Sequence, residues 1–385
     1  MIKEPLIATT MLFALIALGE VISIYTRARV PMLLTAMLGF LLCSWVGLFP
    51  KKILEYSTLP ALGAVLIGPL ILHMGTIMPL SILKKQWRAV VISLCGLIGA
   101  GVLIFSIVTP LFGFEIAASG IGPIAGGIVA LLVTNERLTE LGLVSLIAVP
   151  SLVQALQGVI GMPLASYFMN RYISKDYLER LKSGNHLTTS VTEKPFVESK
   201  FDLLNNNTLR LFIIFALAAL GIWLSKLTGV HYTIFCLALG VAALYFKVLP
   251  QNALEQAKSL NFMVVAIIFV VIGSMGSVTP QDVIDNILPV ITILGLGTLG
   301  IAVGGFIGAK LVKWSPDKGM PVALTALFGF PGDYILCQEV ARAHGKSKQE
   351  EDAIMQELVT PMLIGGFVTV TVTSVIIASF VMNLI

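Results

Sequence analysis

Long apolar stretches recur along the whole chain and are separated by short polar connections. They fall at about 6–26, 30–49, 58–83, 87–113, 118–135, 141–170, 209–227, 231–249, 259–278, 286–311, 319–340 and 355–383. A helix that crosses a bilayer needs about 20 mainly apolar residues, and most of these stretches reach that length. Because a backbone in lipid must satisfy its own hydrogen bonds, helices are favoured. The pattern therefore predicts an all-α integral membrane protein.

One polar stretch interrupts the pattern near the middle of the chain. Residues 173–208 are rich in Ser, Asn and charged side chains, a composition typical of a linker. This stretch divides the chain into a first transmembrane repeat, 1–172, and a second, 209–385. We expect the first apolar stretch to be a retained helix rather than a signal peptide, because it is long enough to span and no Ala-x-Ala cleavage pattern follows it.

The two halves resemble each other in four places. His73–Pro79 matches Ser274–Pro280, Ala17–Gly19 matches Ala219–Gly221, the spacing from Gly126 to Asn135 matches that from Gly329 to Gln338, and Val149–Pro150 matches Thr360–Pro361. Each match is weak, but all four occur in the same order. An internal duplication explains them together, and weak repeats of this kind are common in secondary transporters.

The distribution of charge predicts how the halves are oriented. Lys and Arg collect in cytoplasmic loops. They collect on one side if 118–135 and 319–340 are re-entrant hairpins and the other ten stretches cross, with Lys51 and Lys52 as clear exceptions and Lys226 as a smaller one. Five crossings per half is an odd number, so the second half is inverted. We expect two inverted-topology halves, each of about five transmembrane helices plus one re-entrant or broken helical hairpin. The linker is then cytoplasmic, and both termini lie outside the inner or plasma membrane.

Composition supports lipid as the main solvent and excludes some functions. The chain has 385 residues, of which 57% are hydrophobic and 12% charged, whereas about a quarter of a soluble protein is charged. The formal net charge is +4, and no basic stripe interleaves with aromatic residues, so nucleic acid is not indicated. The four cysteines lie singly in apolar stretches. We expect them to be small apolar side chains rather than a disulfide framework.

The clearest candidate chemistry lies in the second predicted hairpin, at Gly329–Tyr334. Proline removes a backbone donor and glycine admits left-handed torsions, so a helix breaks here. A break at membrane depth is tolerated where the backbone is buried or lines an aqueous cavity, and its freed carbonyls can hold a cation. Asp333 could then bind Na⁺ or a proton, or pair with a substrate ammonium group. The alternative is a solvated loop acid near the membrane surface.

The matching break in the first half, 119–127, has glycines and Pro123 but no acid. It could line the same site with backbone groups, or its glycines could serve close helix packing. Gln154 could bond a substrate or a neighbouring helix. The candidate substrate-binding residues are Ser119, Gly126, Gly127, Thr134, Asn135, Gln154, Phe330, Pro331, Gly332, Asp333, Tyr334 and Gln338. The candidate Na⁺ ligands are Asp333 and Gly329.

Three further ionisable residues lie in apolar stretches, where charge is costly. Glu20 lies near Arg27 and Arg29, and we expect snorkelling or an ion pair there. His73 is expected to be a buried neutral imidazole that donates to a carbonyl, with proton handling as the alternative. Glu339 ends the second hairpin, as a gate residue or an interfacial cap.

Catalysis is not expected. Pro331-Gly332-Asp333 differs from the Gly-x-Gly-Asp signature of intramembrane aspartyl proteases, and the remaining aspartates lie in loops, so a carboxylate dyad is not predicted. There is no H-E-x-x-H, P-loop or G-x-S-x-G motif. We predict no enzyme and no cofactor other than Na⁺ or H⁺ as a coupling ion.

Four stretches resemble the sodium/glutamate symporter family: Arg27–Met32, Gly161–Tyr167, Glu193–Pro195 and Thr360–Gly366. The resemblance implies two inverted halves of five helices and a hairpin, a cytoplasmic linker and outside termini. It also implies hairpin-tip backbone roles for Gly126, Gly127, Gly329 and Gly332. The chain departs from the family at the tips, where a Gly-Gly-His-Gly-Thr motif is replaced by Ile124–Ile128 and a Gly-Phe-Gly-Leu-Gly run by Gly329–Tyr334.

These observations lead to one functional hypothesis and two alternatives. The first is cation-coupled symport of a small organic anion or amino acid such as glutamate, by an elevator-type mechanism in a homodimer. The second is a Na⁺/H⁺ antiporter on the same scaffold, with Asp333 alternating between proton and Na⁺. The third is a transport-inactive sensor or complex subunit that binds a soluble partner through the linker.

Overall fold

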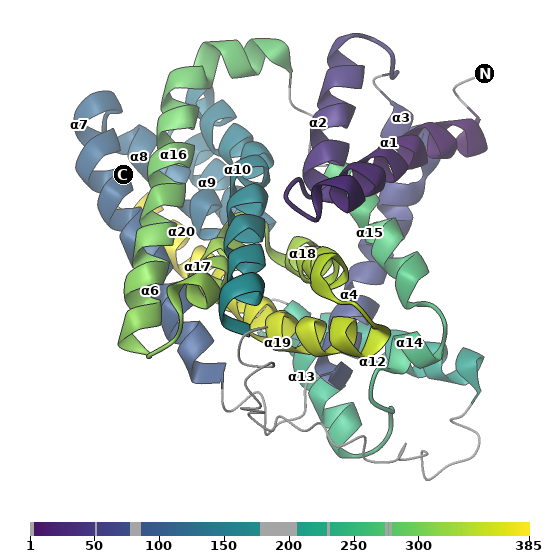
Figure 1. The fold of residues 1–385 in the computed structure, drawn as a ribbon. Helices are drawn as coiled ribbons and strands as arrows, with labels where there is room; N and C mark the ends of the chain where they lie inside the picture. The colour runs from purple at the N-terminus through teal and green to yellow at the C-terminus, as the bar shows by residue number, and fades with distance from the viewer. Residues whose placement is uncertain are drawn as a thin grey trace. The chain divides into compact units, whose positions relative to one another are not determined.

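The computed structural model describes residues 4–50, 52–77, 86–177, 206–228, 232–273, 276 and 279–385. These residues form helices and short connections, and no strand occurs among them (Figure 1). The all-α prediction is therefore confirmed. The predicted linker lies largely outside the described residues, as does most of Ser274–Pro280 in the repeat.

Seven helical runs are long and apolar enough to cross a membrane, by length and composition: Pro5–Thr26, Leu59–Thr76, Trp87–Phe112, Ala148–Lys175, Asn207–Thr228, Val283–Leu311 and Lys348–Met382. Shorter apolar helices cover Met32–Trp45, Phe114–Ala125, Ile234–Tyr245 and Leu260–Gly273. The chain thus has the helices of a membrane protein. Ten crossings and an inverted second half stay predictions.

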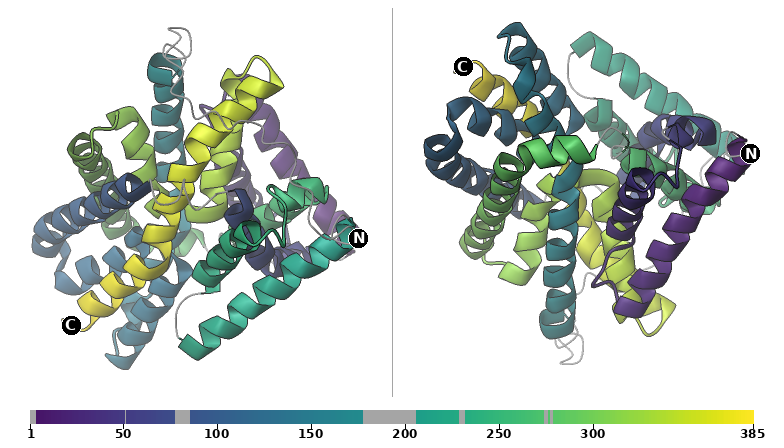
Figure 2. Two further views of the ribbon diagram at one scale, coloured as in Figure 1. Left: turned by 90° about the horizontal axis from the view of Figure 1, so that it is seen from below. Right: turned by 90° about the horizontal axis from the view of Figure 1, so that it is seen from above.

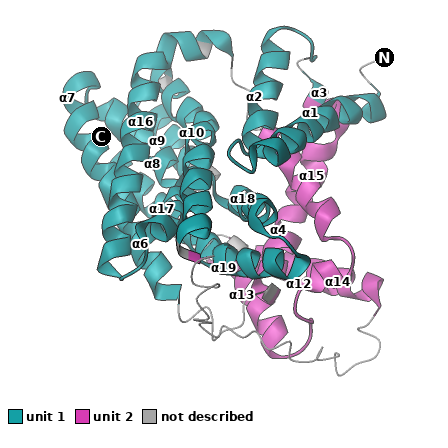
Figure 3. Cartoon of the chain, viewed as in Figure 1, with its two compact units in different colours: residues 1–53, 86–176, 274–385 teal, residues 54–85, 177–273 magenta. Residues whose placement is uncertain are grey.

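The chain forms two compact units, and each draws on both sides of the central linker (Figure 3). Unit 1 comprises residues 1–53, 86–176 and 274–385, and unit 2 comprises residues 54–85 and 177–273. The units are defined by which helices pack together, whereas the predicted repeats are defined by their order along the sequence. The division into units therefore does not test the repeat boundaries, which stay a prediction.

Unit 1 contains most of the helices. They are α1 (Pro5–Thr26), α2 (Met32–Trp45), α6 (Trp87–Leu103), η2 (Ile104–Val108), α7 (Thr109–Phe112), α8 (Phe114–Ala125), α9 (Ile128–Glu140), η3 (Val144–Leu146), α10 (Ala148–Tyr172), α16 (Pro280–Leu311), α17 (Pro316–Leu324), η7 (Thr325–Leu327), α18 (Gly329–His344), α19 (Lys348–Phe367), η8 (Val368–Thr373) and α20 (Ser374–Met382). The short elements α3 (Ile53–Ser57) and η4 (Ile173–Tyr177) lie at the sequence boundaries between the units.

Close packing of α6 against α16 forms one side of unit 1. A Cβ on Gly99 would lie 2.2 Å from the carbonyl oxygen of Gly300, and one on Gly304 would lie 2.1 Å from that of Cys95. These pairs run in opposite directions along the two helices, so α6 and α16 are antiparallel. Small residues let helix backbones approach in lipid, where apolar burial alone does not drive association.

The last helices of unit 1 form one continuous run, in which α19, η8 and α20 follow each other to the C-terminus (Figure 2). This run begins at Lys348, earlier than the apolar stretch predicted at 355–383. Ser347 caps it, because its side chain accepts a hydrogen bond from the backbone N of Glu350. The turn η8 is π-helical, a local widening that is frequent at functional sites.

Unit 2 packs α4 (Leu59–Ile77), α12 (Asn207–Thr228), α13 (Tyr232–Tyr245), α14 (Ala253–Gln256) and α15 (Leu260–Gly273). His73 is fully buried here, as expected. Its role differs from the prediction, because Nδ1 accepts a hydrogen bond from the backbone N of Leu254 at 3.2 Å. Thr76 Oγ1 accepts a second from Ala253 at 3.4 Å. The imidazole and the Thr76 hydroxyl therefore each satisfy one amide at the start of α14, and among the described residues the imidazole does not donate to a carbonyl.

The cysteines behave as small apolar side chains. Cys236 and Cys337 are buried, Cys43 and Cys95 are half-buried, and all four are free thiols. The prediction that they form no disulfide framework is confirmed.

Candidate functional site

The first predicted hairpin is a broken helix that turns back on itself. Helix α8 ends at Ala125, and Gly126 and Gly127 follow at φ values of 105° and 90°. Helix α9 then runs back beside α8, because a Cβ on Gly122 would lie 2.7 Å from Thr134 Oγ1. An unbroken helix would separate these residues by about 18 Å. The predicted break and its reversal are both confirmed.

The second predicted hairpin is also broken, at the Gly-Phe-Pro-Gly sequence. Helix α17 continues into η7, after which Phe328 leaves helical geometry and Gly329 takes a φ of 52°. Phe330 is extended, with a ψ of 136°, and its peptide bond to Pro331 is cis. Regular helix resumes there and continues to His344. Proline and glycine therefore place the break where the sequence predicted it.

The two breaks meet at Val370 of the π-helical turn η8. A Cβ on Gly127 would lie 2.2 Å from the carbonyl oxygen of Val370, and one on Gly329 would lie 2.9 Å from Val370 Cγ2. The breaks also approach each other directly, since a Cβ on Gly126 would lie 2.7 Å from the carbonyl oxygen of Ala326. Two chain segments about 200 residues apart are thus brought together at one point by glycine backbone.

Four helix ends converge at this point. The C-terminal ends of α8 and of the α17–η7 segment bring partial negative charge, and the N-terminal ends of α9 and α18 bring partial positive charge. The ends of broken helices therefore offer carbonyl groups to a cation and amide groups to an anion within one region.

Asp333 lies at the start of the regular part of α18 and is fully buried. Its Oδ1 accepts a hydrogen bond from the backbone N of Tyr334 at 2.7 Å. Its Oδ2 is buried and has no hydrogen-bond partner among the described residues. A Cβ on Gly366 of α19 would lie 2.7 Å from this oxygen, so α19 faces it with bare backbone. A buried carboxylate oxygen without a partner is costly, and a bound cation or proton would remove the cost.

Helix α10 lines the second break with small and amide side chains. A Cβ on Gly161 would lie 2.6 Å from Leu327 Cβ, and one on Gly158 would lie 4.0 Å from the carbonyl oxygen of Leu327. Gln154 and Gln157 precede these glycines by one helical turn, so they share the same face. In the part of the chain that the structure describes, the Oε1 atom of each glutamine is buried without a partner. The amide oxygens therefore belong to the surroundings of the break.

The remaining predicted residues are placed less favourably for binding. The hydroxyl of Ser119 donates to the carbonyl of Ile116 at 2.9 Å, and that of Thr134 donates to the carbonyl of Ala130 at 2.8 Å. Gln338 is exposed. The structure thus groups Gly126, Gly127 and Gly329 around Val370 of η8 and places Asp333 beside Gly366 of α19, while the hydroxyl of Ser119 is used within α8 and Gln338 is exposed.

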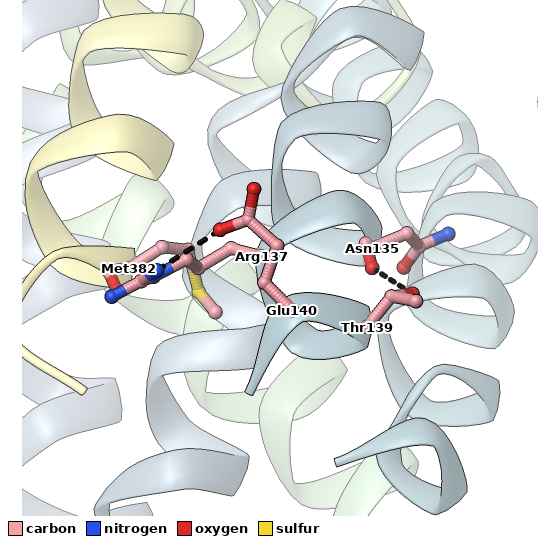
Figure 4. Close-up of polar contacts among 5 residues, drawn as sticks. All are labelled: Asn135, Arg137, Thr139, Glu140 and Met382. Carbon is pink, nitrogen blue, oxygen red and sulfur yellow. Dashed lines mark hydrogen bonds and ion pairs between the residues drawn. The ribbon is translucent and has the colours of Figure 1, made fainter. Parts of the chain in front are cut away.

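Arg137, near the end of α9, connects the first hairpin to α20 (Figure 4). Within α9, the carbonyl oxygen of Asn135 accepts a hydrogen bond from Thr139 Oγ1 at 2.7 Å, while its side-chain Oδ1 is buried without a partner among the described residues. On the other side of the helix, Arg137 forms an ion pair with Glu140 at 3.0 Å. Arg137 Nε also donates to the carbonyl of Met382 at 3.4 Å, which ties α9 to the end of α20.

Glu20 pairs differently from the prediction. Its partner is Arg342 of α18, rather than Arg27 or Arg29 close to it in sequence. Arg27 and Ala28 both take left-handed backbone torsions, which turns the chain sharply between α1 and α2. Sequence proximity could not reveal a partner that tertiary packing supplies.

Gly366 and Val370 are site residues that sequence reasoning missed. Thr360–Gly366 carries a family resemblance, but nothing in its pattern indicates that α19 faces Asp333. In the part of the chain that the structure describes, no group of three or more His, Cys, Asp or Glu side chains could hold a metal ion.

Comparison with protein-family models and with curated proteins gives no match for this chain. The likeness to sodium/glutamate symporters thus stays a prediction from the motifs quoted above.

Proposed function

We propose that this protein is a secondary active transporter that couples the entry of Na⁺ to symport of a small organic anion or amino acid such as glutamate. The observation that carries the proposal is the meeting of two broken helices at Val370, beside the buried carboxyl group of Asp333. Non-helical backbone at membrane depth is tolerated where it is buried in protein or lines a cavity. In secondary transporters such breaks form the substrate and ion sites.

The charges at the breaks fit a cation and an anion bound together. The N-terminal ends of α9 and α18 favour a negative group such as a substrate carboxylate. Asp333 Oδ2, together with carbonyl oxygens released at the second break, favours a cation. Binding of the cation neutralises Asp333 and so removes a repulsion against the anion. Binding of the cation therefore favours binding of the anion, and this couples the two ligands.

The proposed mechanism is elevator-type alternating access. Both breaks, α10 and α19 belong to the same compact unit, so the whole site can move without being taken apart. The close glycine contacts between the breaks and η8 leave little room for them to move separately. Alternating access then requires the unit to move as a body that carries its ligands.

A Na⁺/H⁺ antiporter is the second candidate, and the unpartnered oxygen of Asp333 is the observation that favours it. A lone buried carboxyl group can exchange a proton for Na⁺ without any organic substrate. The two functions differ in one measurable respect, because symport requires a solute and antiport does not.

The test uses purified protein in proteoliposomes with an imposed Na⁺ gradient and radiolabelled glutamate and other small carboxylates. We expect Na⁺-dependent uptake that Asp333→Asn abolishes, since the amide keeps the size of the side chain but cannot become an anion. Asp285→Asn is the matched control, because Asp285 is exposed and bonds Gln281 within α16. Its uptake should equal that of the wild type.

Two results would count against the proposal. Normal uptake by folded Asp333→Asn protein would remove Asp333 from the site. Solute-independent Na⁺/H⁺ exchange, without uptake of any carboxylate, would replace symport by antiport.

A further inference from the structure

Glu339 of α18 is a buried acid that the proposed transport site does not use. Its side chain is 3% exposed. Oε1 accepts a hydrogen bond at 2.9 Å from the backbone N of Met32, the first residue of α2. Oε2 is buried and has no hydrogen-bond partner among the described residues. One oxygen of this carboxyl group is therefore satisfied and the other is not.

Two charges of opposite sign act on Glu339. They belong to Glu20 of α1 and to Arg342, one turn further along α18, and these two side chains form an ion pair. The positive charge of Arg342 is thus already matched. An ionised Glu339 would add one buried negative charge without a counter-charge, which is unfavourable in a low-dielectric interior.

The other groups near this part of α18 do not change that balance. Burial, and then the charge of Arg27, lower the pKa of His344, so its ring is neutral at neutral pH. From α10, the uncharged Asn170 places Oδ1 2.8 Å from His344 Nε2. From α19, Glu350 accepts a hydrogen bond from the backbone N of Lys346 at 2.8 Å, beyond the end of α18.

Ser23 of α1 provides a partner for a protonated carboxyl group. Its side chain is 1% exposed, and its hydroxyl acts as a hydrogen-bond donor to the ionised carboxylate of Glu339. Among the described residues, neither Ser23 Oγ nor Glu339 Oε2 has a partner at full hydrogen-bond geometry. A hydroxyl group both donates and accepts, so Ser23 Oγ can also accept from the O–H group that a proton on Oε2 would create.

We propose that Glu339 is a proton-binding site in its own right, separate from Asp333. One proton from the surrounding water forms an O–H bond with Oε2, while Oε1 keeps its bond to the Met32 amide. The ligand is a proton rather than a metal cation, because hard metal ions take about six or more oxygen ligands. Glu339 lies in the regular part of α18, where no break frees carbonyl oxygens as it does near Asp333, and the site supplies two side-chain oxygens.

The two acids are independent in position. Six residues of helix separate them by about 9 Å along the axis of α18. Asp333 faces Gly366 of α19, whereas Glu339 faces the first amide of α2. Substitution of one acid therefore leaves the surroundings of the other unchanged. The inference does not rest on the identity of a transported solute.

The experiment is infrared difference spectroscopy between acidic and alkaline pH, on purified full-length protein in lipid nanodiscs. We expect a carbonyl band of a protonated carboxyl group that shifts in heavy water. Glu339→Gln should lose this band and keep the hydrogen bond to Met32. Glu357→Gln is the matched control, because Glu357 is ion-paired with Lys318 and should not contribute to the band.

A second variant keeps the test decisive if Glu339→Gln fails to fold. Ser23→Ala removes the acceptor for the new O–H group and should move the band to higher frequency. A band unchanged in Glu339→Gln or in Ser23→Ala would overturn the proposal. In the Asp333→Asn variant, where Glu339 is the one of the two acids that can still carry the proton, loss of the band on adding Na⁺ at fixed pH would overturn the choice of ligand. Normal uptake by Asp333→Asn would bear on the transport proposal alone.

Discussion

At the scale of single residues, Gly127 shows how the first break depends on the absence of a side chain. Its torsions, φ 90° and ψ 138°, lie in a region open to little besides glycine. A Cβ would also lie 2.2 Å from the carbonyl oxygen of Val370. The backbone torsions and the close approach of Val370 therefore both require glycine at position 127, where the two breaks meet.

Gly127→Ala should lower the free energy of unfolding by about 1–3 kcal/mol and reduce uptake, because the new methyl group strains the backbone and pushes η8 away. Gly101→Ala is the control, since nothing lies within 4 Å of a Cβ there. Thermal unfolding of the two purified variants in one detergent checks the expectation. Equal melting temperatures would contradict the geometry of the break.

Asp333 could be found from the sequence, but its surroundings could not. An acid beside Pro331 and Gly332 in an apolar stretch indicates a broken helix with a functional carboxyl group. Its neighbour Gly366 belongs to a segment whose pattern gives no hint of what it faces. Glu20 shows the same limit, because its partner Arg342 is 322 residues away along the chain.

At the scale of elements, ion pairs and a hydrogen bond connect α17, at its end opposite to the second break, to the two neighbouring helices α10 and α19. Lys318 of α17 forms an ion pair with Glu357 of α19, and Tyr172 of α10 donates to the same carboxylate at 2.7 Å. Beside it, Arg171 of α10 pairs with Asp317 of α17 at 2.9 Å. These bonds hold α10, α17 and α19 together at the end of α17 opposite to the break.

Lys318→Met should destabilise the protein by about 1–3 kcal/mol, since it leaves Glu357 partly buried without its counter-charge. Adding Glu357→Gln should recover part of the loss. Lys348→Met is the matched control: Lys348 is 79% exposed and pairs with Asp352 at 3.4 Å, so its effect should stay below about 0.5 kcal/mol. Chemical or thermal unfolding measures both effects. Similar losses of unfolding free energy for the two variants would mean that Lys318 does not stabilise the packing of α17 against its neighbours.

Hydropathy located most elements but misplaced their ends. It predicted apolar stretches at 286–311 and 355–383, whereas the helices begin at Pro280 and Lys348. Both helices start in polar sequence, where a proline or a serine cap sets the boundary and hydropathy carries no signal. The breaks were located accurately, because glycine and proline act on the backbone directly rather than through apolar burial.

At the scale of the whole molecule, compact units and sequence repeats follow different rules. The repeat is a similarity in order along the chain, and the units arise from which helix faces pack together. In unit 1, α6 from the first half packs on α16 from the second through Gly99 and Gly300. Partners in packing can thus come from opposite halves, and a weak repeat gives no information on which faces they use.

The orientation of the two halves is the prediction that tests the whole arrangement. The first break turns back, since Gly122 lies beside Thr134, so the two ends of that segment should reach the same membrane surface. Charge places the flanks of the second break together on the opposite, basic side. With the native cysteines replaced, single cysteines at exposed Glu115 and Glu140 should react with an impermeant maleimide from one side of the membrane.

Cysteines at Lys313 and Lys346, both exposed, should react only from the other side. The physical reason is that a segment which enters and leaves on one surface adds no crossing, so five crossings remain in each half and the second half is inverted. Labelling of the Lys313 and Lys346 positions from opposite surfaces would mean that the second broken segment crosses the bilayer. Its freed backbone groups would then need partners along the whole width of the membrane, and both the inverted topology and the cation site at Asp333 would have to be abandoned.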